Sequence, residues 1–300
     1  MNKITYCSLN EYLKAAYGKK VYKLSIDGGF TCPNRDGSLS TKGCTFCAEG
    51  GSGDFSGSRG KSIKEQLEAG KLLLSNKLKN VTDSCGYIAY FQTYTNTYAD
   101  IEVLDKKYRE ALAGSDIVAL SIGTRPDCIS EEIAKLLYSL KIEFGKDIWI
   151  ELGLQTIHDE TALAINRGYA LNVYDNALKI LEKYQIKVVT HVILGLPNET
   201  KEQMLETVKY IAAGSSWGIK LSLLHVLKGT PLYKDYEDGI YTCLEMDEYV
   251  SLIKECLKII PKTMVVHRIT GDGDRRLLAA PLWSLNKKKV LNTINRALLS

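Results

Sequence analysis

Short apolar runs alternate with longer amphipathic stretches along most of this 300-residue chain. The runs are rich in Val, Ile, Leu and Tyr, and most are uninterrupted, which is typical of strands buried on both faces of a parallel sheet. They cover residues 21–26, 87–91, 117–122, 148–154, 188–194, 219–227 and 264–269. We therefore expect each of these runs to form a strand.

The stretches between the runs carry helix signals. Ser8 and Ser62 are each followed three residues later by a glutamate, the capping-box pattern of a helix N-terminus. A helix should begin after Asn198 and another should cover residues 130–145, where apolar residues recur on one face. Glycines stand where helices should end, at Gly18, Gly114, Gly145 and Gly214.

Alternating strands and helices predict right-handed βαβ units. Six or seven such units suit a partial or near-closed TIM-like (β/α)6 barrel of the α/β class, with its chemistry at the C-terminal ends of the strands. We expect an N-terminal helix in residues 1–18, the barrel core in residues 19–235, and a C-terminal extension packed on the core in residues 236–300.

Composition and charge narrow the class of protein. The chain is 45% hydrophobic and 25% charged, as soluble globular proteins are. No apolar run approaches the roughly 18 residues of a membrane helix, and residues 1–10 lack the pattern of a secretory signal, so we expect a cytoplasmic protein without a membrane partner. The net charge of +4 permits an acidic partner such as RNA but does not require one.

Three cysteines follow the first predicted strand with the spacing C-x11-C-x2-C: Cys32, Cys44 and Cys47. Thiolates suit zinc and iron–sulfur clusters. Structural zinc takes four ligands, and the next candidates along the chain, Cys85 and His158, are distant in sequence. Three thiolates on a four-iron cube would leave one iron open for reaction. The spacing favours a cluster, with zinc or a chance arrangement as alternatives.

The run GGFTCPNRDG at residues 28–37, followed by GCTFC at residues 43–47, resembles the YtqA/YhcC family of radical S-adenosylmethionine (SAM) proteins. That family is related to Elongator-type and oxygen-independent coproporphyrinogen-oxidase-type cores. The similarity continues through GTRPD at 123–127, LGLQT at 152–156, NRGY at 166–169, GLP at 195–197, LKGTP at 227–231 and HRITGDG at 267–273. It covers nearly the whole chain and implies a barrel of the radical SAM type.

The resemblance implies one [4Fe–4S] cluster held by the three cysteines, with SAM chelating the fourth iron. One electron, from a flavodoxin- or ferredoxin-type donor, would cleave SAM reductively and give a 5′-deoxyadenosyl radical that removes a hydrogen from the substrate. Family members are associated with modification of the wobble-uridine side chain, so tRNA is the expected partner. The alternatives are a radical SAM enzyme acting on a small metabolite or peptide, and a non-catalytic zinc-binding interaction protein.

The resemblance also implies SAM contacts for four side chains. Phe46 stands where an aromatic residue packs near the adenine, and Gln155 and Arg167 stand where a pair binds the SAM ribose and carboxylate. A guanidinium suits a carboxylate because it donates two parallel hydrogen bonds. His191 lies near a ribose contact. The plainer alternatives are a packing aromatic, a solvated helix-end charge for Arg167, and a core histidine.

Several segments depart from the family pattern or have two alternative roles. Residues 92–97 (QTYTNT) replace the usual Gly-Gly-Glu that holds the SAM amino group, and Gly123 stands where some relatives carry glutamate. Glu151 and Arg125 are expected either in structural ion pairs or against the substrate. Residues 49–60 form a surface loop or fold over a cofactor, and residues 267–276 form a substrate loop or a solvated connection. The basic residues of a last helix meet RNA or solvent: Lys287, Lys288, Lys289 and Arg296.

Overall fold

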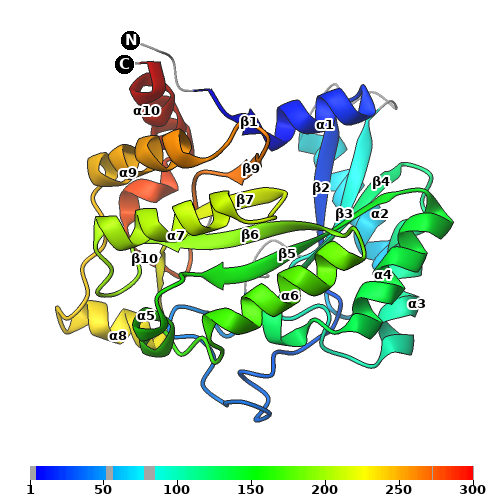
Figure 1. Cartoon of the computed structure of the whole chain (residues 1–300), viewed down its shortest axis with the longest axis horizontal. Coiled ribbons are helices and arrows are strands. Elements are labelled where there is room, and N and C mark those ends of the chain that lie inside the picture. The colour runs from blue at the N-terminus through cyan, green and yellow to red at the C-terminus, as the bar shows by residue number, and fades with distance from the viewer. Residues whose placement is uncertain (1–4, 52–56, 78–84, 272, 300) are drawn as a thin grey trace.

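The computed structural model describes residues 5–51, 57–77, 85–271 and 273–299. Its main feature is a parallel sheet of eight strands in the order β1-β9-β7-β6-β5-β4-β3-β2. The sheet curls into a partial barrel with helices along its outer side (Figure 1). Its strands are β1 (Cys7–Ser8), β2 (Val21–Ile26), β3 (Gly86–Phe91), β4 (Ile117–Thr124), β5 (Asp147–Gln155), β6 (Lys187–Leu194), β7 (Gly218–Leu223) and β9 (Val265–Arg268).

The predicted α/β barrel is confirmed, with one strand prediction wrong. The run at residues 219–227 is not one strand, because the chain leaves the main sheet after Leu223. Residues further on pair with a different partner: β8 (Val226–Leu227) forms a separate antiparallel sheet with β10 (Leu278–Ala280). The amide of Leu224 donates to the carbonyl of Leu194 on the neighbouring strand, which marks the turn away from the sheet.

The helices follow the local signals in the sequence. Ser8 and Glu11 form a reciprocal capping box at the start of α1, and the Ser62 and Glu65 side chains exchange the same bonds before α2. Gly18 and Gly145 end α1 and α4 in the left-handed conformation. The helices are α1 (Leu9–Tyr17), α2 (Ile63–Lys77), α3 (Ile101–Leu112), α4 (Glu131–Phe144), α5 (Asp159–Ala164), α6 (Leu171–Lys183), α7 (Lys201–Ala213), α8 (Pro231–Glu237), α9 (Met246–Ile259) and α10 (Lys287–Leu299).

Both faces of the sheet are buried, which explains why its strands read as uninterrupted apolar runs. On β5, Ile150 and Leu152 belong to the large apolar cluster that the outer helices cover. Trp149, which precedes Ile150 on the strand, belongs instead to an inner cluster that includes Val189 of β6 and Leu13 of α1. Helix α1 therefore closes the N-terminal end of the barrel.

None of the helices in the described part of the chain combines the length and the apolar character that a bilayer crossing requires.

Candidate active site at the C-terminal ends of the strands

A cavity of about 500 Å³ lies at the C-terminal ends of the parallel strands, where such barrels carry their chemistry. Strands β3, β4 and β5 contribute residues to its wall, and so does the loop that follows β2. The seven residues singled out in the sequence all line this one cavity: Cys32, Cys44, Cys47, Phe46, Gln155, Arg167 and His191.

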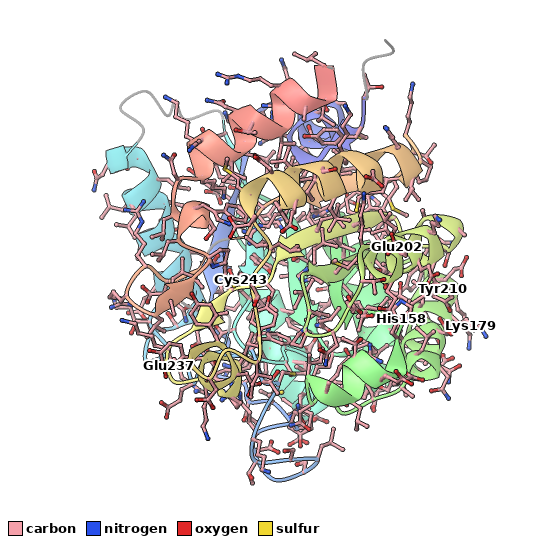
Figure 2. The ribbon with its side chains drawn as sticks, turned by 90° about the vertical axis from the view of Figure 1, so that its left-hand side faces the viewer. His158, Lys179, Glu202, Tyr210, Glu237 and Cys243 are labelled. Carbon is pink, nitrogen blue, oxygen red and sulfur yellow. The ribbon has the colours of Figure 1, made fainter. Side chains whose placement is uncertain are left out.

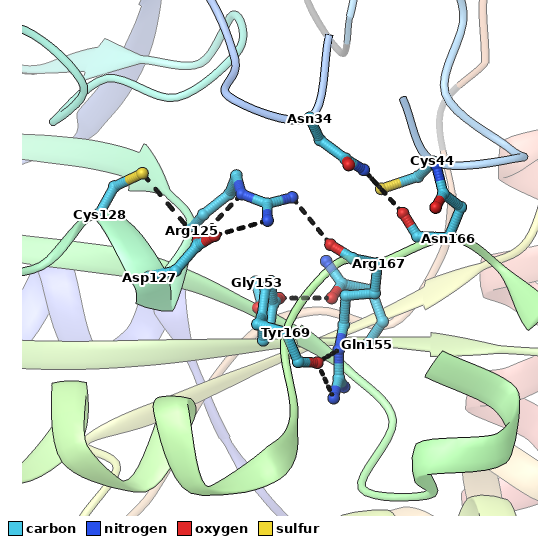
Figure 3. A network of polar contacts seen from close by, with 10 residues as sticks. All are labelled: Asn34, Cys44, Arg125, Asp127, Cys128, Gly153, Gln155, Asn166, Arg167 and Tyr169. Atoms are coloured by element: carbon cyan, nitrogen blue, oxygen red, sulfur yellow. Dashed lines mark hydrogen bonds and ion pairs between the residues drawn. The ribbon is translucent and has the colours of Figure 1, made fainter. Parts of the chain in front are cut away.

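The cysteine loop is held against the rest of the barrel by hydrogen bonds. Asn34 donates its side-chain amide to the carbonyl of Asn166 (2.7 Å) and lies 3.6 Å from the sulfur of Cys44 (Figure 3). The Asn166 side chain in turn donates to the carbonyl of Gly43 (2.6 Å). Arg35 donates to the carbonyl of Cys47 (2.6 Å). These bonds place the three thiols at one cavity wall.

The chemistry of this wall fits an iron–sulfur cluster. Within the described ranges, no three Cys, His, Asp or Glu side chains are grouped as ligands of a single metal ion. The irons of a cube bind separate thiolates, so its ligands line a wider space. Burial, reinforced by Cys47, raises the pKa of the Cys44 thiol to about 12 while Arg125 opposes the shift. A thiol alone there is neutral, and bound iron would displace its proton.

Arg167 braces the end of β5. Its side chain is 1% exposed, and its guanidinium donates to the carbonyls of Leu154 (2.8 Å), Thr156 (2.6 Å) and Tyr169 (3.0 and 2.9 Å). Its nearest carboxylate is Asp159, at 3.6 Å. Arg167 is therefore no solvated charge, and its predicted contact with the SAM carboxylate stays a prediction.

Tyr169 links this brace to Gln155. Its hydroxyl donates to the carbonyl of Gly153 and to the Gln155 side-chain oxygen (3.1 Å), as Figure 3 shows. Gln155 has a φ of 65°, which turns the backbone sharply where β5 ends. The guanidinium groups of Arg167 and Arg125 lie 4.5 and 4.9 Å from the centre of the Tyr169 ring. The Tyr169 hydroxyl thus holds the Gln155 side chain at the cavity wall.

Comparisons with known proteins identify the family to which this chain belongs. Residues 32–211 match the sequence family described as the radical SAM superfamily, and residues 216–299 match the radical SAM C-terminal domain. The chain belongs to the radical SAM superfamily. It is 46% identical to YtqA of Bacillus subtilis, covering 98% of this chain and 89% of YtqA. It is 39% identical to YhcC of Escherichia coli K12, covering 92% of this chain and 86% of YhcC.

A more distant likeness links the chain to Elongator proteins. Elongator complex protein 3 of Drosophila melanogaster is 28% identical over 52% of this chain and 28% of its own length. The solved structure of the archaeal Methanocaldococcus infernus Elp3 superposes with a TM-score of 0.68 at 20% identity, covering 94% of this chain. This chain spans 64% of that Elp3 chain. At such identity the likeness shows a shared fold alone.

The radical SAM cavity has a polar layer of which the sequence analysis singled out only Glu151 and His191. It consists of one inward-facing side chain from each of seven strands, between the inner apolar cluster and the strand ends. Its members are Lys23, Tyr90, Ser121, Glu151, His191, Lys220 and Arg268. Counting alternate positions along each predicted strand would have found them, because inward-facing residues recur with period two.

Glu151 stands at the centre of this polar layer. Its carboxylate is bonded to Lys220 (2.9 Å), His191 (2.8 Å), Ser121 (2.8 Å) and Lys23. Burial opposes the ionisation of Glu151, but the charges of Lys220 and Lys23 together with the interaction with His191 hold its pKa well below the ordinary value. Glu151 is thus held by an ion network, whereas Arg125 pairs with Asp127 (2.7 Å).

His191 remains neutral within this layer. Burial and the nearby charge of Lys220 lower its pKa to about 4 even though Glu151 opposes the shift. Its ring faces both the cavity and the carboxylate of Glu151. The predicted contact between His191 and the SAM ribose stays a prediction.

The segment that replaces the usual Gly-Gly-Glu ties two strand ends together. The Asn96 amide donates to the carbonyls of Gly123 (2.8 Å) and Phe91 (3.3 Å), and the hydroxyls of Thr97 and Thr124 lie 2.6 Å apart. A Cβ on Gly123 would lie 3.2 Å from the Phe91 carbonyl oxygen, so glycine permits this close approach.

The remaining predicted segments also border the cavity in part. Gly51 lines it, but residues 52–56 of the glycine-rich loop lie outside the described residues. Arg268, the last residue of β9, and Gly273, in the segment that follows β9, both line it. Among the other cysteines, Cys256 is fully buried, while Cys243 is half-buried on the connection between α8 and α9 (Figure 2).

Proposed function

We propose that this radical SAM enzyme modifies the side chain of the wobble uridine in tRNA. The observation that carries the enzymatic part is that Cys32, Cys44 and Cys47 line one cavity together with Gln155. The tRNA part rests on the resemblance to the YtqA/YhcC and Elongator-type proteins and on the charge of the C-terminal region.

In this proposal the three cysteines hold a [4Fe–4S] cluster. When bound, the cluster and SAM supply one-electron cleavage chemistry and a hydrogen-abstracting radical. The chain itself positions the reacting groups and keeps water away from them. Phe46 and Ile193 line the cavity and pack against a buried apolar cluster that includes Leu224. Such a wall excludes water from reactive species.

A basic hollow near the cavity supports an RNA partner. It is lined by Arg275, by Trp283 and by three lysines at the start of α10, Lys287, Lys288 and Lys289. Lysine and arginine neutralise phosphates along a nucleic-acid backbone, and an aromatic ring offers a stacking surface. The segment that carries Arg275 follows Gly273, which borders the reaction cavity. An RNA docked on this hollow would therefore have the cavity within reach.

Anaerobic reconstitution tests the cofactor assignment. We expect about four irons per chain and formation of 5′-deoxyadenosine on reduction with SAM. Cys44→Ala should lose both, while Cys256→Ala, at a buried cysteine of α9 away from the cavity, serves as the matched control. Stoichiometric zinc without SAM cleavage would refute the assignment.

Nucleoside mass spectrometry tests the substrate. Transfer RNA from a strain that lacks the gene should contain an altered wobble uridine, and the reconstituted enzyme should restore the missing nucleoside. An unchanged nucleoside profile under several growth conditions would reject tRNA and favour a small metabolite or a peptide.

A further inference from the structure

The polar layer carries more positive than negative charge. Lys23, Lys220 and Arg268 are its cations, and Glu151 is its one carboxylate. Among the described residues that line the cavity, Glu151 is again the sole carboxylate. His191 adds no negative charge, and its pKa of about 4 keeps it neutral near pH 7. Among the described residues, Lys23 and Lys220 therefore share the single carboxylate of Glu151, which leaves a surplus of positive charge.

Lys220 is the member of the layer on which this surplus acts most directly. Its side chain is 9% exposed, and its ammonium group bonds to Glu151 (2.9 Å) and to the Tyr90 hydroxyl (3.2 Å). An ammonium has three N–H donors, so one donor remains for a ligand. Burial, Arg268 and Lys23 lower the pKa of Lys220 to about 8 although Glu151 opposes them. A further anion would stabilise this charge.

The polar layer and the cysteines come from different parts of the fold. Cys32, Cys44 and Cys47 belong to the loop that follows β2, whereas Glu151 and Lys220 belong to the strands β5 and β7. Gly153 follows Glu151 at the next inward position of β5, and the side-chain nitrogen of Gln155 lies 2.7 Å from where a Cβ on Gly153 would stand. Glu151, Lys220 and Arg268 line the same cavity as the cysteines, so a molecule that enters this cavity can reach the polar layer.

We propose that Lys220, together with Arg268, binds a carboxylate of the substrate at the polar layer. Both side chains line the cavity, and their Cα positions are paired between β7 and β9. An ammonium beside a guanidinium suits a carboxylate, because both groups donate charge-assisted hydrogen bonds. The inference rests on the proposed function and deepens it: the part of the tRNA that enters the cavity bears an acid group. The other source of the same chemistry is the carboxylate of SAM.

The first experiment probes the subsite without RNA. Acetate, with acetamide as the neutral control, is added to the reconstituted enzyme with SAM, and the thermal midpoint is measured. A ligand that binds the folded protein raises its midpoint. Acetate should raise the midpoint of the wild type, acetamide should not, and Lys220→Met should lose most of the response. Lys187→Met is the matched control, because Lys187 pairs with Asp147 (3.0 Å) on strands of the same sheet and does not line the cavity. Equal acetate responses in the wild type and Lys220→Met would overturn the proposal.

The second experiment identifies the source of the carboxylate. Transfer RNA from the deletion strain is used as isolated or after its carboxylates are capped as methylamides. Capping should reduce conversion by at least roughly tenfold, and Lys220→Met should raise the KM for tRNA by a similar factor with less than about a twofold change in the Kd for SAM. Lys220→Arg, which keeps the charge, should recover part of the loss.

The outcomes separate the two proposals. A Kd for SAM that rises in step with the KM would assign the polar layer to the SAM carboxylate and overturn the substrate subsite. Conversion of capped and uncapped tRNA at equal rates would also overturn it. If no tRNA is converted by the wild type, the proposed function fails, and the acetate series still decides whether Lys220 binds a carboxylate.

Discussion

Replacing Glu151 with glutamine keeps the shape of the side chain and removes the anion around which the polar layer is built. Glu151 is 1% exposed, and its carboxylate is bonded to Lys220, Lys23 and two other side chains. The amide retains one acceptor oxygen but leaves the buried Lys220 and the partly exposed Lys23 without this counter-charge. Removing one partner of a buried ion pair costs about 3–5 kcal/mol, so we expect Glu151→Gln to lower the free energy of unfolding by about 3 kcal/mol.

Urea unfolding at pH 7 measures this loss, because a change of midpoint at constant slope reports a change in stability. Glu131→Gln is the matched control: its partner Lys183 lies 2.9 Å away, but both side chains are largely exposed. An exposed pair of this kind contributes less than about 1 kcal/mol.

A double variant tests the physical reason. In Glu151→Gln/Lys220→Met the unpaired ammonium is gone, so the double variant should lose less stability than the sum of the two single changes. The reasoning is refuted if Glu151→Gln lies within about 0.5 kcal/mol of the wild type, or if the two changes are simply additive.

Three further predictions concern the same barrel. Because the pKa of His191 is lowered from 6.5 to about 4, the unfolded chain binds a proton at this residue before the folded chain does as the pH falls. The contribution of His191 to the free energy of unfolding is therefore complete above about pH 6.5 and falls by about 3 kcal/mol towards pH 4. His191→Asn should flatten this part of a plot of urea midpoint against pH. Arg167→Lys should lower the unfolding free energy by about 2–3 kcal/mol, measured by urea, since a lysine cannot reach the three carbonyls that the guanidinium bonds. Gly145→Ala should lower the unfolding free energy by about 1 kcal/mol in the same assay, because Gly145 has a φ of 60°. Ala164→Gly, at a right-handed helical position, is the contrasting case. An unchanged unfolding free energy in Gly145→Ala would contradict the capping role.

The sequence predicted most of the strands and several helix ends correctly, and the reasons are local. A buried parallel strand must be apolar on both faces, so runs such as residues 148–154 stand out without knowledge of their neighbours. The capping box of Ser8 and Glu11 joins residues three positions apart, and its hydrogen bonds form wherever the helix begins. The motif around Cys44 likewise indicates its chemistry through the residue types themselves.

The errors and omissions concern contacts between distant parts of the chain. Residues 219–227 carry one apolar run, but Val226 pairs with Ala280 in a second sheet, a partner that periodicity does not reveal. The two-residue strand β1 exists because Cys7 pairs with Val265 across nearly the whole chain. Arg167 was weighed as an exposed charge, and it is buried against carbonyls that come together only when β5 ends in a tight turn.

The sequence by itself determined which residue types could bind iron and which segments could be strands, because those properties belong to side chains and to their spacing. Only the tertiary structure decided that Lys23, Glu151 and Lys220, from three separate strands, share one buried network. The reason is geometric: curling the sheet points alternate residues of every strand into one interior, and a buried charge is stable only beside the partners that this interior supplies.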